Sequence, residues 1–539
     1  MFSRILAARG INHPEEIQFD FASLLPWRDL KHCDLAAEIL LDAIIEQKKI
    51  FIVADYDADG ATAAAIAIRF LRSVKANVDY FVPNRFEHGY GLTPEIVTIA
   101  EKNNADLIVT VDNGIASVSG VDKANVLGIK VLITDHHLPG ADLPKATCIV
   151  NPNQPDDVFP SKHLAGVGVM FYVLVALRAL LREQDFFSEN NKEPNLAKLL
   201  DLVALGTVAD VVRLDKNNRI LVSQGIKRIH AHESNPGIKA LFKVANKKPE
   251  LARSMDLGYI IGPRLNAAGR LTDMRTGIEC LITDNINEAT KLANELDALN
   301  KNRRQIEADM QEKALAITEK IDTSKSSGIT LFDPNWHPGI VGILASRIKE
   351  RFRSPTIAFA PDGDKKLKGS GRSIQGVHLR DVLDKITKIS PTIIKTFGGH
   401  AMAAGLTIDV KALEEFTRLF NEAIAYELDK NPIDATNFTD GRLTPSEVSR
   451  DLVSEIDAMV WGQGFPQPTF RNKFIAHNHK IVGEKHTKLQ VSFREENKIF
   501  DAIRFNHIDL PPDLIDGVYR LEVNHFFKEQ PIQLIFEYW

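Results

Sequence analysis

Three carboxylates stand at alternate positions in the segment DYDADG, at Asp55, Asp57 and Asp59. Like charges at this spacing repel one another, and a bound divalent cation removes that cost. The pattern matches the start of a calcium EF-hand loop, but the twelfth position, which needs a glutamate, holds the apolar Ile66. The segment therefore predicts a divalent-metal site of another kind, and the alternative is a solvated acidic turn.

Further candidate ligands follow in the chain: Asp112 in TVDNG, and His136 and His137 in TDHH. A mixed set of carboxylates and imidazoles suits Mn²⁺. Two ions about 3.5 to 4 Å apart need a ligand between them, and a centrally placed Asp112 is a natural bridge. Asp210 closes the apolar segment LVALGTVAD, where burial of a carboxylate demands a metal or a helix cap. The alternative for the histidine pair is a helix cap with surface histidines.

These motifs each follow a short apolar run of the kind that forms a buried strand, as in KIFIVA before Asp55. Helix-like stretches lie between the runs, for example at 94–103 and 117–127. Alternating strand and helix predicts an α/β fold with a doubly wound parallel sheet, whose site lies at the carboxyl ends of the strands. We therefore expect Asp57, Asp59, Asp112 and His136 to meet within a few ångströms.

The remaining segments predict further parts of the chain. Residues 164–225 are mostly helical in pattern, and 285–322 contain no Gly or Pro, which indicates one long helix. Short alternating runs near the C-terminus indicate a small all-β barrel. We expect an N-terminal helical segment (1–48), a catalytic α/β domain (49–284), a long linker helix (285–322), a second, smaller α/β domain (323–432) and a barrel that resembles an oligonucleotide-binding (OB) fold (437–539).

Composition excludes several classes of protein. The chain has 539 residues, 44% of them hydrophobic and 25% charged, so it is neither one small binding module nor a disordered or fibrous protein. Three cysteines, far apart in sequence, exclude a disulfide framework and a CxxC zinc site. The sequence has no apolar run of about 18 residues or more, so we expect no membrane segment and a cytoplasmic protein.

The net charge of −5 gives no sign of a polyanionic partner, but residues 347–395 hold twelve Lys or Arg against five Asp or Glu. Two glycine clusters lie in or beside this basic stretch, and they suggest a phosphate clamp because glycines let backbone N–H groups approach an anion. The candidate clamp residues are Ser370, Gly371, Arg372, Ser373, Gly398, Gly399 and His400. The alternative is a pair of ordinary loops.

A third candidate group lies in PRLNAAGRL, where Arg264, Asn266 and Arg270 could contact the same substrate or pair with acids. In the C-terminal barrel, aromatic side chains alternate with basic ones. Aromatics at period two belong first to the core, but an OB barrel would place a few on its open face to stack on bases. The aromatics are Phe470, Phe474, Phe493, Phe500, Phe505, Tyr519, Phe526 and Phe527, and the basic residues are Arg471, Lys473, Lys485, Lys488 and Arg494.

The set DYDADG, VDNG, DHH and GTVAD resembles the DHH phosphoesterase family, and PRLNAAGRL, GSGRS and GGH resemble that family's linker and DHH-associated domain. The resemblance implies metal ligands at Asp55 or Asp57, and at Asp59, Asp112, His136 and Asp210. It also implies that His137 lies close to the scissile phosphate. Some relatives have a histidine two residues before the first aspartate, where this chain has Val53, so Asp55 is the candidate substitute ligand.

The order of these motifs over nearly the whole chain is similar to that of the family's 5′ to 3′ exonucleases of single-stranded DNA. This implies two Mn²⁺ or Mg²⁺ ions and 5′-mononucleotide products. It also implies a monomer that acts in recombinational and mismatch repair with a single-strand-binding protein and a helicase. Two alternatives stay open: an enzyme of the same superfamily for a small phosphoester or pyrophosphate, and a non-catalytic DNA-binding scaffold.

Overall fold

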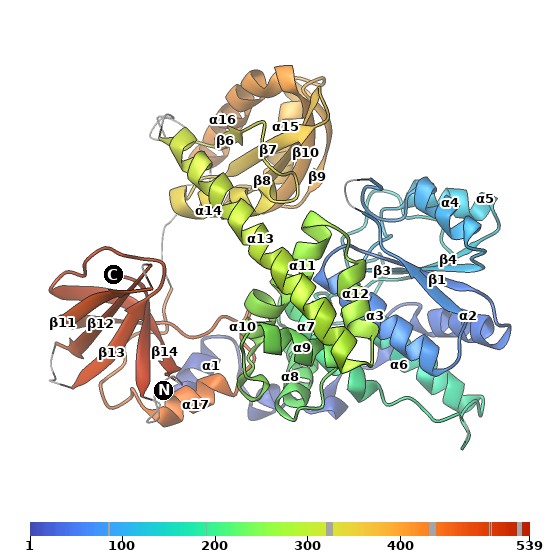
Figure 1. Cartoon of the computed structure of the whole chain (residues 1–539), viewed down its shortest axis with the longest axis horizontal. Helices are drawn as coiled ribbons and strands as arrows, with labels where there is room; N and C mark the ends of the chain where they lie inside the picture. Colours follow the sequence, from blue (N-terminus) through green and yellow to red (C-terminus); the bar gives the residue numbers. More distant parts are fainter. Residues whose placement is uncertain are drawn as a thin grey trace. The chain divides into compact units, whose positions relative to one another are not determined.

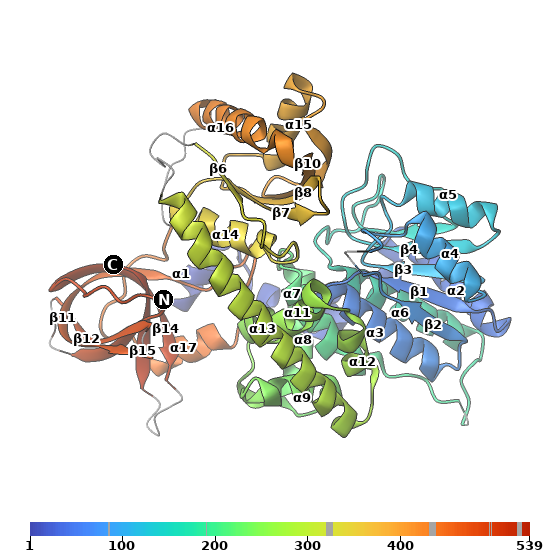
Figure 2. The same cartoon turned by 45° about the horizontal axis from the view of Figure 1, so that its top comes forward.

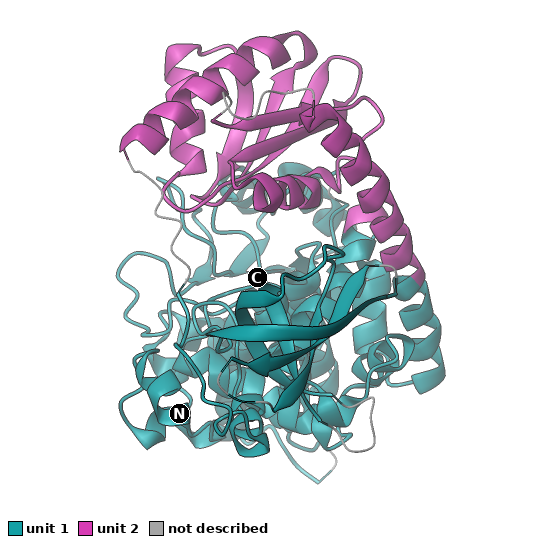
Figure 3. Ribbon diagram, turned by 90° about the vertical axis from the view of Figure 1, so that its left-hand side faces the viewer, with its two compact units in different colours: residues 1–269, 273–297, 437–539 teal, residues 270–272, 298–436 magenta. Residues whose placement is uncertain are grey.

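The computed structural model describes residues 1–84, 87–189, 191–319, 327–430, 438–483, 485–494, 496, 498–524 and 531–539. These residues form two compact units, which Figure 3 shows in two colours. Unit 1 comprises 1–269, 273–297 and 437–539, and unit 2 comprises 270–272 and 298–436. Within the described ranges, no helix has both the length and the apolar character needed to cross a membrane.

Unit 1 is built on the parallel sheet that the strand–helix alternation predicts (Figure 1). Every neighbouring pair in the sheet is parallel, and the order is β2-β1-β3-β4-β5. The three central strands are almost wholly buried, because helices cover both faces. The strands are β1 (Ile50–Ala54), β2 (Val78–Phe81), β3 (Leu107–Val111), β4 (Lys130–Thr134) and β5 (Cys148–Val150).

Helices pack on the two faces of this sheet as a doubly wound fold requires. One face packs against α4 (Pro94–Lys102) and α5 (Val118–Val126), with Phe51, Ile108 and Val131 in the shared core. The other face carries α2 (Cys33–Ile45), α3 (Ala58–Ser73) and α6 (Gly166–Glu183), and α6 contacts both of the others. Figure 2 shows α4 and α5 on the side of the sheet away from α6.

A helical region follows α6 in unit 1. It contains α7 (Leu200–Ala209), α8 (Lys216–His230), α9 (Pro236–Val244), α10 (Ser254–Asp256), a π-helical turn η6 (Leu257–Ile261), α11 (Gly262–Leu271) and α12 (Arg275–Ile282). Helix α7 packs on α3, α6 and α8, and therefore carries the GTVAD motif to the sheet. A short helix α1 (Phe2–Ala7) opens the chain.

The C-terminal part of unit 1 is a closed five-stranded barrel with the order β11-β12-β13-β15-β14. The strands are β11 (Phe470–Val482), β12 (His486–Phe493), β13 (Ile499–Arg504), β14 (Leu514–Val523) and β15 (Ile532–Tyr538), preceded by α17 (Arg450–Asp457). The barrel segment contacts the helical region through an Arg253–Asp457 ion pair of 3.0 Å. Ser254 Oγ also donates to the carbonyl of Trp461 at 2.6 Å.

Unit 2 is the smaller α/β domain expected in the second half of the chain. Its sheet has the order β6-β7-β8-β10-β9, in which β6 and β7 are parallel and the other pairs antiparallel. The elements are β6 (Ile329–Phe332), α14 (Val341–Phe352), β7 (Thr356–Asp362), β8 (Lys366–Arg372), α15 (Leu379–Ile389), β9 (Ile394–Gly399), β10 (Ala403–Asp409) and α16 (Leu413–Lys430).

The long helix expected over 285–322 is α13 (Ile286–Thr318). Its first turns bury Ala289, Ala293 and Leu296 in unit 1, whereas Met310 and Ala314 belong to the core of unit 2. Residues 320–326, where the expected helix ends, lie outside the described residues. The finer division of the chain into five parts stays a prediction.

Candidate active site and metal centre

The predicted side chains meet at the carboxyl edge of the parallel sheet. The neighbouring strands β1, β3 and β4 end at Ala54, Val111 and Thr134, and each is followed directly by an aspartate. These aspartates are Asp55, Asp112 and Asp135, and all three are buried. Strands that lie side by side in a parallel sheet end at the same edge, so three motifs far apart in sequence form one cluster.

Asp112 occupies the most constrained position in the cluster. Its φ of 64° is left-handed, which is rare for a residue other than glycine and clusters at functional sites. The start of helix α6 packs closely against Asp112, since a Cβ at Gly166 would lie only 2.5 Å from the Asp112 Cβ. The backbone is therefore held in a costly conformation that aims the carboxylate at the other strand ends.

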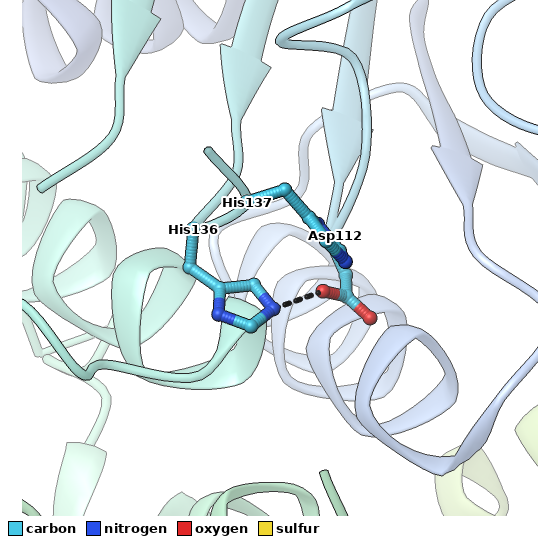
Figure 4. A group of neighbouring side chains, drawn as sticks. All are labelled: Asp112, His136 and His137. Carbon is cyan, nitrogen blue, oxygen red and sulfur yellow. Dashed lines mark ion pairs between the residues drawn. The ribbon is translucent and has the colours of Figure 1, made fainter. Parts of the chain in front are cut away.

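His136 is the imidazole at the centre of the cluster. Its Nε2 lies 3.1 Å from Asp112 Oδ1, 3.4 Å from Asp210 Oδ2 and 4.0 Å from Asp59 Oδ2. Figure 4 shows the His136 ring pointing at the Asp112 carboxylate, with His137 next to it. Asp210 reaches this group because it follows the last residue of α7. The structure thus brings Asp59, Asp112, His136 and Asp210 together.

Asp59 is anchored by a helix terminus. Its carboxylate oxygens accept the backbone N–H groups of Gly166 at 2.6 Å and Val167 at 2.9 Å, at the start of α6. A helix N-terminus favours a carboxylate through its free N–H groups and its dipole. Burial and the charge of Asp57 nevertheless raise the pKa of Asp59 to about 7.

Asp55 and Asp57 complete the acidic side of the site. Asp57 caps helix α3, and its Oδ1 accepts the N–H groups of Asp59 and Gly60. Asp55 Oδ1 accepts the N–H of Tyr56 at 2.8 Å. Both carboxylates lie within ligand distance of Asp112, since one oxygen from each of the three lies within 4.8 Å of the others. Which of the two contacts an ion stays open.

The donor set fits divalent cations. Three overlapping groups have ligand atoms within 4.8 Å of one another: Asp55, Asp57 and Asp112; Asp112, His136 and His137; and Asp59, His136 and Asp210. Asp112 belongs to two of them, as a bridging ligand must. Its buried Oδ1 makes no hydrogen bond among the described residues, although His136 Nε2 lies 3.1 Å away. A buried oxygen without a hydrogen bond is costly, and a cation between the two ligand atoms would satisfy it.

The electrostatics of the cluster agree with this fit. Burial, and then repulsion from Asp59 and Asp57, raise the pKa of Asp112 well above its ordinary range. The pKa of Asp210 is raised in the same way, by burial and then by Asp59 and Asp57. Without a cation these carboxylates must share protons or repel one another, and two positive ions would keep them ionised.

His137 has a dedicated carboxylate partner, Asp135, which was not among the predicted site residues. Its Nδ1 lies 2.7 Å from Asp135 Oδ1, and Asp135 Oδ2 accepts the N–H of Ile115. Burial opposes a charged imidazole, but the hydrogen bond and charge of Asp135 outweigh burial and raise the pKa of His137 to about 9. The position of Asp135 directly after a strand could have revealed it.

Tyr90 is a second residue that sequence reasoning missed. Its hydroxyl lies 3.4 Å from His137 Nε2, and the two rings meet edge to face with centroids 6.0 Å apart. Gly89 and Gly91, on either side of it, have φ of 76° and 74°, so the turn that presents Tyr90 needs both glycines. No periodic pattern marks such a residue in the sequence.

Helix α11, which carries PRLNAAGRL, packs against the acidic loop. Asn266 Oδ1 accepts the N–H of Ala58 at 2.8 Å, and a Cβ at Gly269 would lie 1.9 Å from the Tyr56 carbonyl oxygen. The buried Arg264 pairs with Asp297 at 2.8 Å. Arg264 therefore pairs with an acid, which was the alternative to a substrate contact in the sequence analysis. Arg270, in unit 2, donates to the Gly339 carbonyl at 3.1 Å. Substrate contacts for the three residues stay predictions.

In unit 2, the clamp candidates Arg372 and Ser370 lie next to each other at the end of β8. Arg372 Nη1 lies 2.8 Å from the carbonyl oxygen of Gly371 and 3.3 Å from Ser370 Oγ. Desolvation lowers the pKa of Arg372, and no ion pair joins it to a carboxylate of the described residues. A Cβ at Gly342 would lie 2.9 Å from Ser370 Oγ and 3.2 Å from Arg372 Nη2, so the first turn of α14 faces this pair.

The other clamp candidates differ in their burial and in their hydrogen-bond partners. Ser373 is buried and donates its hydroxyl to the Val377 carbonyl, and Gly371 lies in β8 against Leu379. Gly398 borders open space. Gly399 has a φ of 144°, and the backbone N–H of the exposed His400 donates to the Ala403 carbonyl. Phosphate contacts for these five clamp candidates stay predictions.

Most barrel aromatics belong to the core, as their period suggested. Phe470, Phe474, Phe493, Phe500 and Tyr519 are buried. Phe505 is 47% exposed, and it is the described residue of the set that could stack on a base. Phe526 and Phe527 lie outside the described residues. The expected stacking surface therefore contains few of the aromatics named from the sequence.

A parallel sheet with carboxylates and histidines at its strand ends, followed by a second α/β unit and a closed barrel, defines a metal-dependent DHH phosphoesterase. Comparison with known proteins agrees. Residues 49–207 match the DHH family, N-terminal domain; residues 325–426 match the DHHA1 domain; and residues 439–538 match the RecJ OB domain.

The single-stranded-DNA-specific exonuclease RecJ of Escherichia coli (strain K12) is 49% identical over 100% of this chain and 95% of its own length. RecJ of Bacillus subtilis (strain 168) is 32% identical over 99% of the chain and 67% of its own length. The crystal structure of RecJ from Thermus thermophilus in complex with Mn²⁺ matches 99% of the chain and 75% of its own, with a TM-score of 0.82 and 28% identity. The chain belongs to the RecJ family.

Proposed function

We propose that this protein is a metal-dependent exonuclease that degrades single-stranded DNA from its 5′ end to 5′-mononucleotides. The observation that carries the proposal is the cluster of Asp112, His136 and Asp210 at the sheet edge, in which a buried Asp112 oxygen lies 3.1 Å from His136 Nε2 but makes no hydrogen bond among the described residues. The relatives named RecJ supply the substrate class, since they are described as single-stranded-DNA-specific exonucleases.

The residues of the cluster have distinct roles in this reaction. Asp55 or Asp57, together with Asp59, Asp112, His136 and Asp210, would hold two Mn²⁺ or Mg²⁺ ions, with Asp112 shared between them. When bound, such ions neutralise phosphate charge and lower the pKa of a water so that it can attack phosphorus. Asp135 fixes the His137 ring through Nδ1, and Nε2, which lies 3.4 Å from the Tyr90 hydroxyl, would donate to an oxygen of the scissile phosphate.

The clamp candidates in unit 2 would determine that digestion begins at the 5′ end of the strand. Ser370 and Arg372 lie near each other and near the first turn of α14, so a hydroxyl, a guanidinium and a helix N-terminus would be available to one anion. Arginine binds a phosphate through two parallel hydrogen bonds, and a terminal phosphate exposes more oxygens than an internal one. A 5′-phosphate held there would select the end at which digestion begins.

The barrel provides a second contact for the strand. A groove of about 270 Å³ on β11, β12 and β13 is lined by Asn478, His479, Lys480, Lys488, Leu489, Gln490 and Asp501. Basic and amide side chains on these strands suit a nucleic-acid backbone, and this is the face that OB folds use. A barrel of this kind supports a polymeric substrate over a small phosphoester.

The experiment uses one oligonucleotide in three forms: single-stranded with a 5′ label, single-stranded with a 3′ label, and fully paired. With Mn²⁺ we expect the 5′ label to appear in mononucleotide at once, whereas the 3′ label stays in shortening strands and the duplex persists. Early release of the 3′ label would contradict the polarity. A dinucleotide degraded as fast as the strand would favour a small-substrate enzyme, and no release at all would favour a non-catalytic scaffold.

The cellular setting follows from the family rather than from the geometry. We propose a cytoplasmic monomer that acts in recombinational and mismatch repair beside a single-strand-binding protein and a helicase. The resemblance of the chain to RecJ over its whole length supports this setting. Pull-down of the two partners with the purified protein, and its mass in solution, test it.

A further inference from the structure

Val211 directly follows the candidate ligand Asp210 and has an unusual backbone. Its φ is 60°, in the left-handed region, and its N–H donates to the Val208 carbonyl as helix α7 ends. A β-branched residue rarely adopts this conformation, because its side chain clashes with the local backbone. Among the described non-glycine residues with positive φ, Val211 is the only one with an apolar side chain.

The fold gains little from a valine at this position. The side chain is 63% exposed, so it contributes only part of its surface to the core. A helix that ends in a left-handed residue usually carries glycine there, which would form the same turn without strain. Strain that the fold does not require points to a role for the side chain itself.

Two other exposed residues with apolar surface are next to, or in contact with, a candidate site residue. Leu138 directly follows His137 and is 60% exposed, and Tyr90, whose ring meets His137, is 49% exposed. We call Tyr90, Leu138 and Val211 the apolar rim. Each of the three is bonded to, or in contact with, a residue of the metal-binding groups, and Asp210 and His137 both lie near His136. The three exposed residues of the rim are thus each linked to a candidate site residue, Tyr90 by ring contact and the other two by direct succession in the chain.

We propose that the apolar rim is a nucleoside-binding surface, and that Val211 packs against the sugar or base next to the scissile phosphate. The proposal rests on the exonuclease function proposed above. Apolar contact of this kind favours a base that has left the stack, because a paired and stacked base has little free surface. The rim would thus contribute to the choice of a single strand without reading its sequence.

The test combines a protein change with a substrate change. Val211→Gly removes the side chain and keeps the left-handed turn, and Lys75→Gly makes the same change at an exposed left-handed residue after α3, with φ of 59°. The substrates are one single strand and its copies with an abasic residue at the first or second position from the degraded end. The measurements are kcat/KM, the Mn²⁺ concentration for half-maximal rate, and the melting temperature.

We expect Val211→Gly to lower kcat/KM on the intact strand about fivefold to tenfold, the value of partly burying one aliphatic side chain. The melting temperature should not fall and the Mn²⁺ requirement should not change, whereas Lys75→Gly should keep full activity. One abasic position should slow the wild-type protein and have little further effect on Val211→Gly, because the contact is already lost.

Three results would overturn the proposal. A lower melting temperature for Val211→Gly would mean that the side chain serves the fold, and a changed Mn²⁺ requirement would mean that it acts through Asp210. An equal loss of rate on the abasic strands in both proteins would mean that Val211 does not contact the sugar or base. Failure of the wild-type protein to degrade the intact strand would instead contradict the proposed function. The two failures are therefore distinguishable.

Discussion

Asp112 has three features that destabilise the folded protein, so selection for stability alone would not retain them. The residue is buried, its φ is left-handed, and its neighbours are carboxylates whose charge raises its pKa. These features favour the binding of cations, because a rigid, dehydrated carboxylate is a good metal ligand that needs no reorganisation. The residue is thus best explained as part of a metal site.

We predict that Asp112→Ala leaves less than a few per cent of the wild-type turnover in saturating Mn²⁺, because a shared ligand holds both ions. Binding of single-stranded DNA should change little, since the clamp residues belong to unit 2 and the barrel groove to β11–β13. Turnover and DNA affinity are measured together, with Asp122→Ala, on the exposed side of α5, as the control. Substantial turnover would remove Asp112 from the bridging role.

A second prediction at this scale concerns Arg372. Its loss removes a charge-assisted contact of about 1.5 to 3 kcal/mol, so Arg372→Ala should reduce use of a 5′-phosphorylated strand about tenfold to a hundredfold. A strand with a 5′-hydroxyl should be affected much less. Arg380→Ala, which removes an exposed charge from the same unit, should affect both strands equally. Equal loss on both strands with Arg372→Ala would mean that this residue holds an internal phosphate.

At the scale of elements, the sequence predicts strand ends well and the packing between helices poorly. The apolar runs before Asp55, Asp112 and Asp135 specify buried parallel strands, so their common edge follows from topology. The anchoring of Asp59 by the start of α6 depends on residues more than 100 positions away, and no local pattern reveals it. Tyr90 was missed for the same reason, because a tertiary contact alone gives it meaning.

The contact between α11 and the acidic loop gives a prediction for an element. Gly269→Ala would place a methyl group 1.9 Å from the Tyr56 carbonyl oxygen, so α11 or the loop must move. We expect a loss of about 1 to 3 kcal/mol in stability and reduced Mn²⁺ affinity. Gly140→Ala is the control, since its methyl group would lie 3.8 Å from its nearest neighbour. Unchanged denaturation of Gly269→Ala would show that this close packing is not needed.

At the scale of the whole molecule, the grouping of the barrel with the catalytic sheet in one compact unit was not predictable. Composition suggests only the number of folding units. The joining contacts, such as Arg253 with Asp457 and Ser254 with Trp461, connect residues about 200 positions apart. Charged and polar residues at such positions look like ordinary surface residues in the sequence.

Metal should stabilise unit 1. Cations that bind only the folded cluster add about 2.7 kcal/mol at a hundred times their dissociation constant. We therefore expect EDTA to lower the melting temperature of the full chain and excess Mn²⁺ to restore it. Asp112→Ala should show almost no Mn²⁺-dependent shift. A wild-type melting temperature that does not respond to either reagent would contradict a structural link between the ions and this cluster.

The most direct test of the account is anomalous diffraction from crystals of the full chain grown with Mn²⁺. We predict two manganese peaks about 3.5 to 4 Å apart, one on each side of the Asp112 carboxylate, with His136 and Asp210 contacting one of them. The same crystals of Asp112→Ala should lose at least one peak. A single peak remote from Asp112, or none at the ends of β1, β3 and β4, would contradict the shared-ligand site from which the proposed function follows.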